Sequence, residues 1–183
     1  MRTVTVIAIV AAAAAGIIAL ALFFNPLAIT SVDPEIEEQQ EIIVGGATPG
    51  NNGYRQINIT VNNVDLVADV AATDDQRSKG LSVKDSLNEN EAMLFVFSTE
   101  REHSFWMKNM KFPIDILWLD DYQEVVHVEH SLEPCIPDEF CKPYKPDRNS
   151  LYVLETVAGF AQKYNVTENT YVDFQLDKQL APE

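Results

Sequence analysis

The sequence predicts a mainly β domain of the α+β class, compact and mostly antiparallel, folded as a barrel or sandwich with two short helices. Two observations support this class: many short apolar runs are separated by tight polar turns, and no long amphipathic helix lies among them. A third feature, a long apolar run near the start of the chain, predicts one N-terminal transmembrane helix ahead of the domain.

Residues 1–24 are predicted to form a membrane anchor. The run Val4–Phe24 contains no charged residue, and a helix of this length spans about 30 Å, the thickness of the hydrocarbon core of a bilayer. Arg2 precedes the run and acidic residues follow it. The positive-inside rule then predicts a single-pass protein of the cytoplasmic membrane, with its N-terminus inside and its domain outside. The alternative is a cleaved signal peptide, because Ala19 and Ala21 fit a cleavage site, and the domain would then be secreted.

Three further regions follow the anchor. Residues 25–53 contain prolines, a glutamate-rich run and several glycines, which together predict a flexible acidic linker. Residues 54–178 are predicted to form the β-rich domain, and residues 179–183 a short C-terminal tail.

The first part of the domain is predicted to be a hairpin followed by a short helix. Apolar and polar residues alternate from Ile57 to Val61, as in a half-buried strand, and two asparagines turn the chain into a second strand at Val64–Val70. Thr73 and Gln76 form a capping box that begins the helix, and Gly80 fits the left-handed position that ends it.

The remaining elements are further strands and a second short helix. The helix is predicted within Ala158–Tyr164, where alanines and aromatic residues recur at helical spacing. Met93–Phe97 is apolar throughout, as in a strand that is buried on both faces. The other predicted strands are Ile114–Leu119, Glu124–Glu129, Leu151–Val157 and Tyr171–Leu176.

The stretch Phe105–Asp115 combines residue types that seldom occur together. Aromatic, methionine, lysine and asparagine side chains precede a proline and a carboxylate, and apolar strands flank the stretch on both sides. A surface loop would not carry a tryptophan next to a methionine, and a core strand would not carry Lys108 and Asn109. The composition indicates a lined pocket or a buried polar pair in the wall of the barrel.

Several short motifs follow one another along the domain. They are Ala68-Asp69, Arg77-x-x-Gly80-Leu81, Met93-Leu94-Phe95-x-Phe97, Phe105-Trp106-Met107-Lys108-Asn109, Pro113-Ile114-Asp115-Ile116 and Tyr152-Val153-Leu154-Glu155 with Ala158-Gly159. In this order they resemble the DUF192 family of domains of unknown function, from about Ile57 to Leu176. The resemblance implies an exported or membrane-anchored, β-rich single domain, and it supplies no reaction or cofactor. Lys84 stands where the family usually has arginine, so the charge is kept but the bidentate fork is lost.

Six residues are predicted to line a ligand pocket: Arg77, Trp106, Lys108, Asn109, Asp115 and Trp118. The two indoles would supply flat apolar walls, and the other side chains would present polar groups to a small molecule. Asp115 shares a strand face with apolar residues, so its carboxylate needs a partner, for which Arg77 is the first choice. The alternative is a structural network, in which Asp115 accepts hydrogen bonds from Arg77 or from backbone amides and no ligand binds.

The leading functional hypothesis is a noncatalytic, membrane-tethered binding module for a small polar or saccharide-like ligand. The first alternative is a hydrolase-type enzyme that uses Asp115 or Glu155, with Arg77 as an anion-binding group. Asp69, Asp115 and Glu155 are the carboxylates that could pair as acid and base. The second alternative is a purely structural module of the cell envelope. No serine lies in a nucleophile elbow, so no catalytic residue is assigned.

The net charge excludes one class of function, and the cysteines and sequons add further predictions. The chain carries 28 acidic and 13 basic residues and a formal net charge of -15, which argues against nucleic-acid binding. Cys135 and Cys141 are predicted to form a disulfide, because such bonds persist in exported proteins. Asn58 and Asn165 begin glycosylation sequons. No metal site is expected, because His127 and Glu129 share a strand face but His130 points the other way. No cofactor is expected either.

Overall fold

The computed structural model describes residues 48–49 and 53–180. The predicted anchor at residues 1–24 and nearly all of the predicted linker lie outside this part of the chain, as does the end of the predicted tail. No helix within the described residues is long and apolar enough to cross a membrane. The transmembrane segment therefore stays a prediction.

Ten strands and three short helices make up the described part of the chain. The strands are β1 (Thr48–Pro49), β2 (Arg55–Val61), β3 (Val64–Ala71), β4 (Glu91–Arg101), β5 (Phe105–Trp106), β6 (Ile114–Leu119), β7 (Val125–Leu132), β8 (Pro143–Tyr144), β9 (Ser150–Val157) and β10 (Val172–Phe174). The helices are α1 (Asp74–Lys79), the 3-10 helix η1 (Gly80–Val83) and α2 (Phe160–Lys163). The predicted mainly β class with two short α-helices is thereby confirmed.

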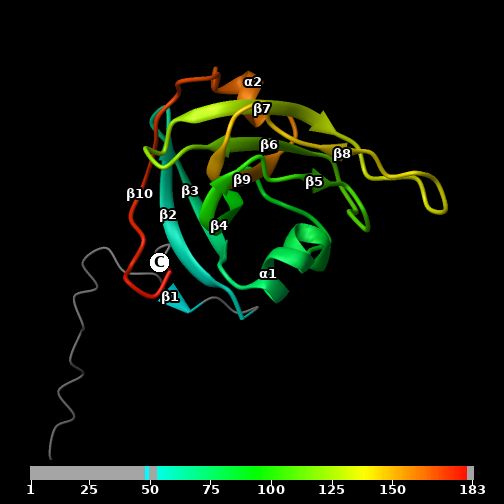
Figure 1. Ribbon diagram of the computed structural model, residues 1–183, viewed down its shortest axis with the longest axis horizontal. Coiled ribbons are helices and arrows are strands. Elements are labelled where there is room, and N and C mark those ends of the chain that lie inside the picture. The colour runs from blue at the N-terminus through cyan, green and yellow to red at the C-terminus, as the bar shows by residue number, and fades with distance from the viewer. Residues whose placement is uncertain (1–47, 50–52, 181–183) are drawn as a thin grey trace, which may run out of the picture. The chain divides into compact units, whose positions relative to one another are not determined.

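Eight of these strands form one mixed sheet in the order β1-β2-β3-β4-β9-β6-β7, with β10 beside β2 (Figure 1). Every pair in this sheet is antiparallel except β3 with β4, which α1 and η1 connect. β5 and β8 form a separate two-stranded sheet. The mostly antiparallel pairing agrees with the prediction. The parallel crossover was not predicted, because a helix as short as α1 leaves no long helical period in the sequence.

The mixed sheet curls into a half-barrel, which corrects the predicted barrel or sandwich (Figure 1). The two outer edges approach each other where Val172 N donates to Gln123 O and where Val125 N donates to Thr170 O. Only the isolated bridge between Glu124 and Tyr171 joins the two edges in the described part of the chain.

Strand β6, most of β9 and the first half of β4 are buried on both faces. All residues of β6 are buried, as is the run Ala92–Val96 of β4, in agreement with the continuous apolar pattern of the sequence. Side chains on one face pack with α2 and β10, whereas those on the other face pack with Leu81 of η1 and with Met107. A polar side chain in these buried parts of the strands is therefore taken out of bulk water.

Helix α1 begins and ends at the residues that the sequence predicts. Gln76 N donates to Thr73 Oγ1 at 3.3 Å, and Thr73 N donates to Gln76 Oε1 at 3.1 Å, which completes the capping box. Gly80 follows the helix with a φ of 49°, and a Cβ atom placed there would lie 3.2 Å from the Phe95 ring. Glycine meets both conditions without strain.

Gly80→Ala is expected to lower the free energy of unfolding by about 1–3 kcal/mol, because the methyl group adds backbone strain and a close contact with Phe95. Gly159→Ala is the matched control, since Gly159 also has a positive φ, of 84°, but nothing lies within 4 Å of its Cβ position. Urea denaturation of both variants should show the larger loss at Gly80. Equal losses would mean that the contact with Phe95 is unimportant.

Candidate ligand-binding pocket

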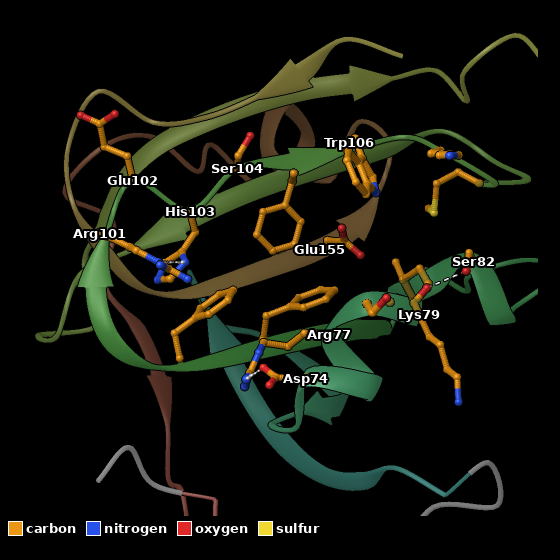
Figure 2. A pocket seen from close by; sticks show the side chains of 18 residues that line it. Asp74, Arg77, Lys79, Ser82, Arg101, Glu102, His103, Ser104, Trp106 and Glu155 are labelled. Carbon is orange, nitrogen blue, oxygen red and sulfur yellow. Dashed lines mark hydrogen bonds and ion pairs between the residues drawn. The ribbon is translucent and has the colours of Figure 1, made fainter. Parts of the chain in front are cut away.

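A pocket lies between the helical segment α1–η1 and the residues that lead from β4 through β5 (Figure 2). Its volume is about 560 Å³, which suits a small molecule. The helical segment supplies Arg77 and Lys79 to one wall, and the segment after β4 supplies Trp106 and Lys108 to the other. Glu155 reaches the pocket from β9.

The apolar lining of the pocket consists of aromatic rings. Phe105 meets Phe95 edge to face, with ring centroids 4.8 Å apart, and meets Phe97 in the same way at 6.3 Å. Trp106 follows on β5, where it pairs with Pro143 of β8, and 61% of its surface is exposed. An indole ring is therefore open to solvent beside a partly buried aromatic cluster.

Glu155 places a buried carboxyl group in the wall of the pocket. The residue is only 4% exposed, and its Oε2 atom has no hydrogen-bond partner among the described residues. Burial raises the pKa of the Glu155 carboxyl from its ordinary value of 4.5 to about 8. At neutral pH the group is therefore protonated, and it can both donate and accept a hydrogen bond.

The register of β6 and β9 explains why Glu155 and Asp115 point in different directions. In this antiparallel pair Ile116 lies opposite Glu155, and Asp115 lies opposite Thr156. Residues opposite each other share a face of the sheet, and successive residues alternate between faces. The two carboxyl groups therefore lie on opposite faces, which excludes the predicted pairing of Asp115 with Glu155 as acid and base.

Asp115 is fully buried and accepts three backbone hydrogen bonds. Its Oδ1 atom accepts from the amides of Ser131 at 2.7 Å and Gly159 at 3.0 Å, and its Oδ2 atom accepts from Ala161 at 2.8 Å. The predicted partnership with Arg77 is wrong, because these amides satisfy the carboxylate on the face of the sheet that turns away from the pocket. Asp115 instead fits the structural alternative, in which backbone amides hold it.

Arg77 joins α1 to the neighbouring strands. Its Nη1 atom donates to the carbonyl oxygens of Ala72 at 2.6 Å and Val96 at 2.7 Å, and its Nη2 atom pairs with Asp74 at 2.6 Å. The guanidinium group also lies 5.3 Å from the centroid of the Phe97 ring. Arg77 thus lines the pocket, but most of its hydrogen-bonding capacity is used within the protein.

His103 is buried next to the same phenylalanine. Its ring stacks on Phe97 with centroids 3.5 Å apart. Its Nδ1 atom accepts from Arg101 Nε at 3.3 Å, so its Nε2 atom carries the proton and donates to Thr99 O at 3.0 Å. Burial lowers the pKa of His103 below its ordinary value. A neutral imidazole with both nitrogens engaged is poorly placed for proton transfer to a ligand.

The structure brings together half of the predicted pocket residues: Arg77, Trp106 and Lys108 line the pocket, whereas Asn109, Asp115 and Trp118 lie outside its lining. Asn109 is exposed with a φ of 61°, and Trp118 is fully buried with its Nε1 atom donating to His103 O at 2.8 Å.

Arg101 and His103 line the pocket but were not predicted, because they lie in a polar connection without a recognisable motif. Glu155 was predicted only as a catalytic candidate, although a lone acid in an apolar strand is a visible signal.

Lys84 and Asp69 form an ion pair inside the protein. The Nζ atom of Lys84 lies 3.0 Å from Asp69 Oδ2, and the two side chains are 17% and 1% exposed. Gln56 Nε2 donates to the other carboxylate oxygen at 2.8 Å. Lys84, which stands where the resemblance implies an arginine, therefore has a structural partner and does not line the pocket.

The two cysteines and the two sequons lie outside the pocket lining. Cys135 and Cys141 form the predicted disulfide, with Cα atoms 5.5 Å apart. Across residues 48–49 and 53–180, no group of three or more His, Cys, Asp or Glu side chains could hold a metal ion. Asn58 and Asn165 are both exposed, so the use of either sequon stays a prediction that the fold permits.

The comparison with known families settles which family the chain belongs to. The model of the DUF192 family, described as an uncharacterised ACR, matches residues 57–174. The chain belongs to the DUF192 family. No curated protein matches it.

Solved structures with a fold similar to this DUF192 domain include two bacterial proteins. A protein of unknown function from Novosphingobium aromaticivorans is 24% identical, with a TM-score of 0.62, and the match covers 72% of this chain and 94% of that one. A proposed transcription regulator from Sinorhizobium meliloti is 22% identical, with a TM-score of 0.60, and the match covers 66% of this chain and 95% of that one. At these identities the likeness shows the fold alone.

The buried carboxyl group of Glu155 makes the stability of the domain depend on pH. The unfolded chain releases this proton near pH 4.5, whereas the folded chain keeps it up to about pH 8. The folded state binds more protons between these values, so this group lowers the free energy of unfolding as the pH rises through that window. Its contribution is most favourable below the window and least favourable above it.

Glu155→Gln removes this titration and keeps the shape of the side chain. Relative to the unsubstituted protein, the variant should gain on the order of a few kcal/mol in free energy of unfolding as the pH rises from 4.5 to about 8. Urea denaturation at several pH values measures the difference, in which the titration of all other groups cancels. Glu168→Gln, at an exposed position, is the control and should show no such trend. A pH-independent difference at Glu155 would contradict the prediction.

Proposed function

We propose that this domain is a noncatalytic binding module for a small polar, saccharide-like ligand, which binds in the pocket between α1–η1 and β5. The observation that carries the proposal is the buried carboxyl group of Glu155, whose Oε2 atom has no partner within the described residues. A buried polar group without a hydrogen bond costs on the order of 1–3 kcal/mol. A ligand hydroxyl group that reached this carboxyl would recover that free energy.

Trp106 supports a ligand with both polar and apolar surfaces. Sugar rings present C–H faces beside their hydroxyl groups, so they bind where an aromatic ring stands near polar groups. Figure 2 shows Trp106 and Glu155 at the same end of the pocket. The next residue, Met107, is buried, and its carbonyl oxygen accepts from Cys135 N at 3.1 Å. The backbone that carries the indole is therefore held in place in the free protein. This preorganisation lowers the entropic cost of binding.

The arrangement of the ionisable groups favours binding over catalysis. Asp115 lies on the other face of the sheet from Glu155, and His103 uses both ring nitrogens within the protein. A purely structural role would account for Asp115 and Arg77, which serve the fold through their hydrogen bonds. It would not account for Glu155 and Trp106, which take no part in those networks.

The proposal includes a location outside the cytoplasmic membrane, with the domain tethered by residues 1–24 or secreted after their removal. The disulfide between Cys135 and Cys141 supports this location, because disulfides form and persist in oxidising compartments. The pocket would then sample solutes of the cell exterior or envelope.

Trp106→Ala is expected to abolish ligand binding and to leave the fold intact, because the side chain is 61% exposed and contributes little to the core. A thermal-shift screen of the full-length protein against sugars, sugar derivatives and other small polar compounds identifies the ligand. A compound at 100 times its dissociation constant should stabilise the protein by about 2.7 kcal/mol.

Tyr122→Ala is the matched control for this substitution, since Tyr122 is an aromatic residue that is 75% exposed and does not line the pocket. The control should bind as the unsubstituted protein does. Full binding by Trp106→Ala would refute the proposed site. Loss of folding in Trp106→Ala would instead assign the tryptophan to the fold.

A further inference from the structure

The charge of the pocket differs from the charge of the chain. The chain as a whole has a formal net charge of -15. Basic side chains nevertheless outnumber acidic ones in the pocket lining. The basic residues are Arg77, Lys79, Arg101 and Lys108, and the acidic residues are Asp74, Glu102 and Glu155. This local excess of basic groups bears on the chemistry of the ligand.

Most of these charges have partners inside the protein. Arg77 pairs with Asp74 at 2.6 Å. Lys79 pairs at 2.7 Å with Asp75, outside the lining, and Glu102 pairs at 2.6 Å with Lys145. Each of these pairs is locally neutral. They therefore do not determine the sign of the charge that a ligand would meet.

Arg101 and Lys108 are the exceptions. Within the described range, Arg101 uses only its Nε atom, which donates to His103 Nδ1 at 3.3 Å, and both terminal nitrogens of its guanidinium group stay available. Lys108 is exposed and has no hydrogen bond or ion pair in the described part of the chain. Glu155 does not offset these cations, since its buried carboxyl group is protonated at neutral pH. The unpaired charge of the pocket is positive.

We propose that the ligand is an anionic sugar, a polyhydroxylated ring that carries a carboxylate or a phosphate group. This inference rests on the proposed function and names its ligand class. The ring packs on Trp106, a hydroxyl group bonds to Glu155, and the anionic group pairs with Lys108 or with Arg101. Carboxylates and phosphates both match the donors of a guanidinium or ammonium group.

The positive charge of Arg101 and Lys108 also argues against cationic and neutral ligands. A ligand with an amino group would meet two unpaired cations and gain no unpaired anion in return. The net negative charge of the chain repels an anion, whereas the two unpaired cations of the pocket attract it. A neutral sugar would satisfy Trp106 and Glu155 but would leave both cations unused.

Isothermal titration calorimetry of the full-length protein with three matched probes tests the inference. The probes are a neutral hexose, the corresponding hexuronate and the corresponding hexose phosphate. At least one anionic probe is expected to bind about tenfold more tightly than the hexose, equivalent to about 1.4 kcal/mol. Added salt should reduce this advantage, because it screens exposed charges. The two anionic probes together distinguish a sugar acid from a sugar phosphate.

Single substitutions then locate the anionic group. Lys108→Gln and Arg101→Gln each remove one unpaired cation, and at least one of them should abolish the preference for the anionic probe while binding of the hexose persists. Lys178→Gln is the matched control, because it removes an exposed lysine that does not line the pocket. The control should keep the full preference.

Three outcomes would overturn the inference. Equal affinity for the hexose and both anionic probes would overturn it and leave the proposed function intact. A preference for an anion that survives in both Lys108→Gln and Arg101→Gln would overturn it in the same way, since the charge recognition would then lie elsewhere. Absence of binding by all three probes would overturn both the inference and the proposed saccharide-like ligand.

Discussion

The structure depends on a sheet whose central strands are apolar on both faces. A polar side chain in β6, in most of β9 or in the run Ala92–Val96 of β4 leaves bulk water when the chain folds, and an unpaired charge there would cost several kcal/mol. Asp115 and Glu155 meet this constraint in different ways. Asp115 accepts hydrogen bonds from three backbone amides, whereas Glu155 retains a proton and has no partner for Oε2 among the described residues.

These two solutions have different consequences for the molecule. The amides that bind Asp115 come from the end of β7, from the N-cap of α2 and from α2 itself, so one side chain fixes two elements to a central strand. Glu155 fixes no other element, and its burial lowers stability at neutral pH. A group that costs stability and opens into a pocket is typical of a binding site rather than of a structural support.

Local sequence signals were sufficient for most of the elements but not for the assignment of the two carboxyl groups. The capping box of Thr73 and Gln76 and the apolar run of β4 each depend on residues that are close together in the sequence, and both were predicted correctly. The faces to which Asp115 and Glu155 point depend on the strand register, and strands that are apolar on both faces lack the alternation that reveals it. The partners of Asp115 are backbone amides, which every residue except proline supplies, so no residue pattern marks them.

The carboxyl carbon of Glu155 offers the most direct measurement. A 13C NMR titration of the labelled protein, with Glu155→Gln used to assign the resonance, reports the protonation of this one group. The expected result for a buried carboxyl group without a hydrogen-bond partner is a midpoint near pH 8. This midpoint should shift when a ligand occupies the pocket. A midpoint near the ordinary value of 4.5 would contradict this picture, because it would show that the group is solvated or already paired in the free protein.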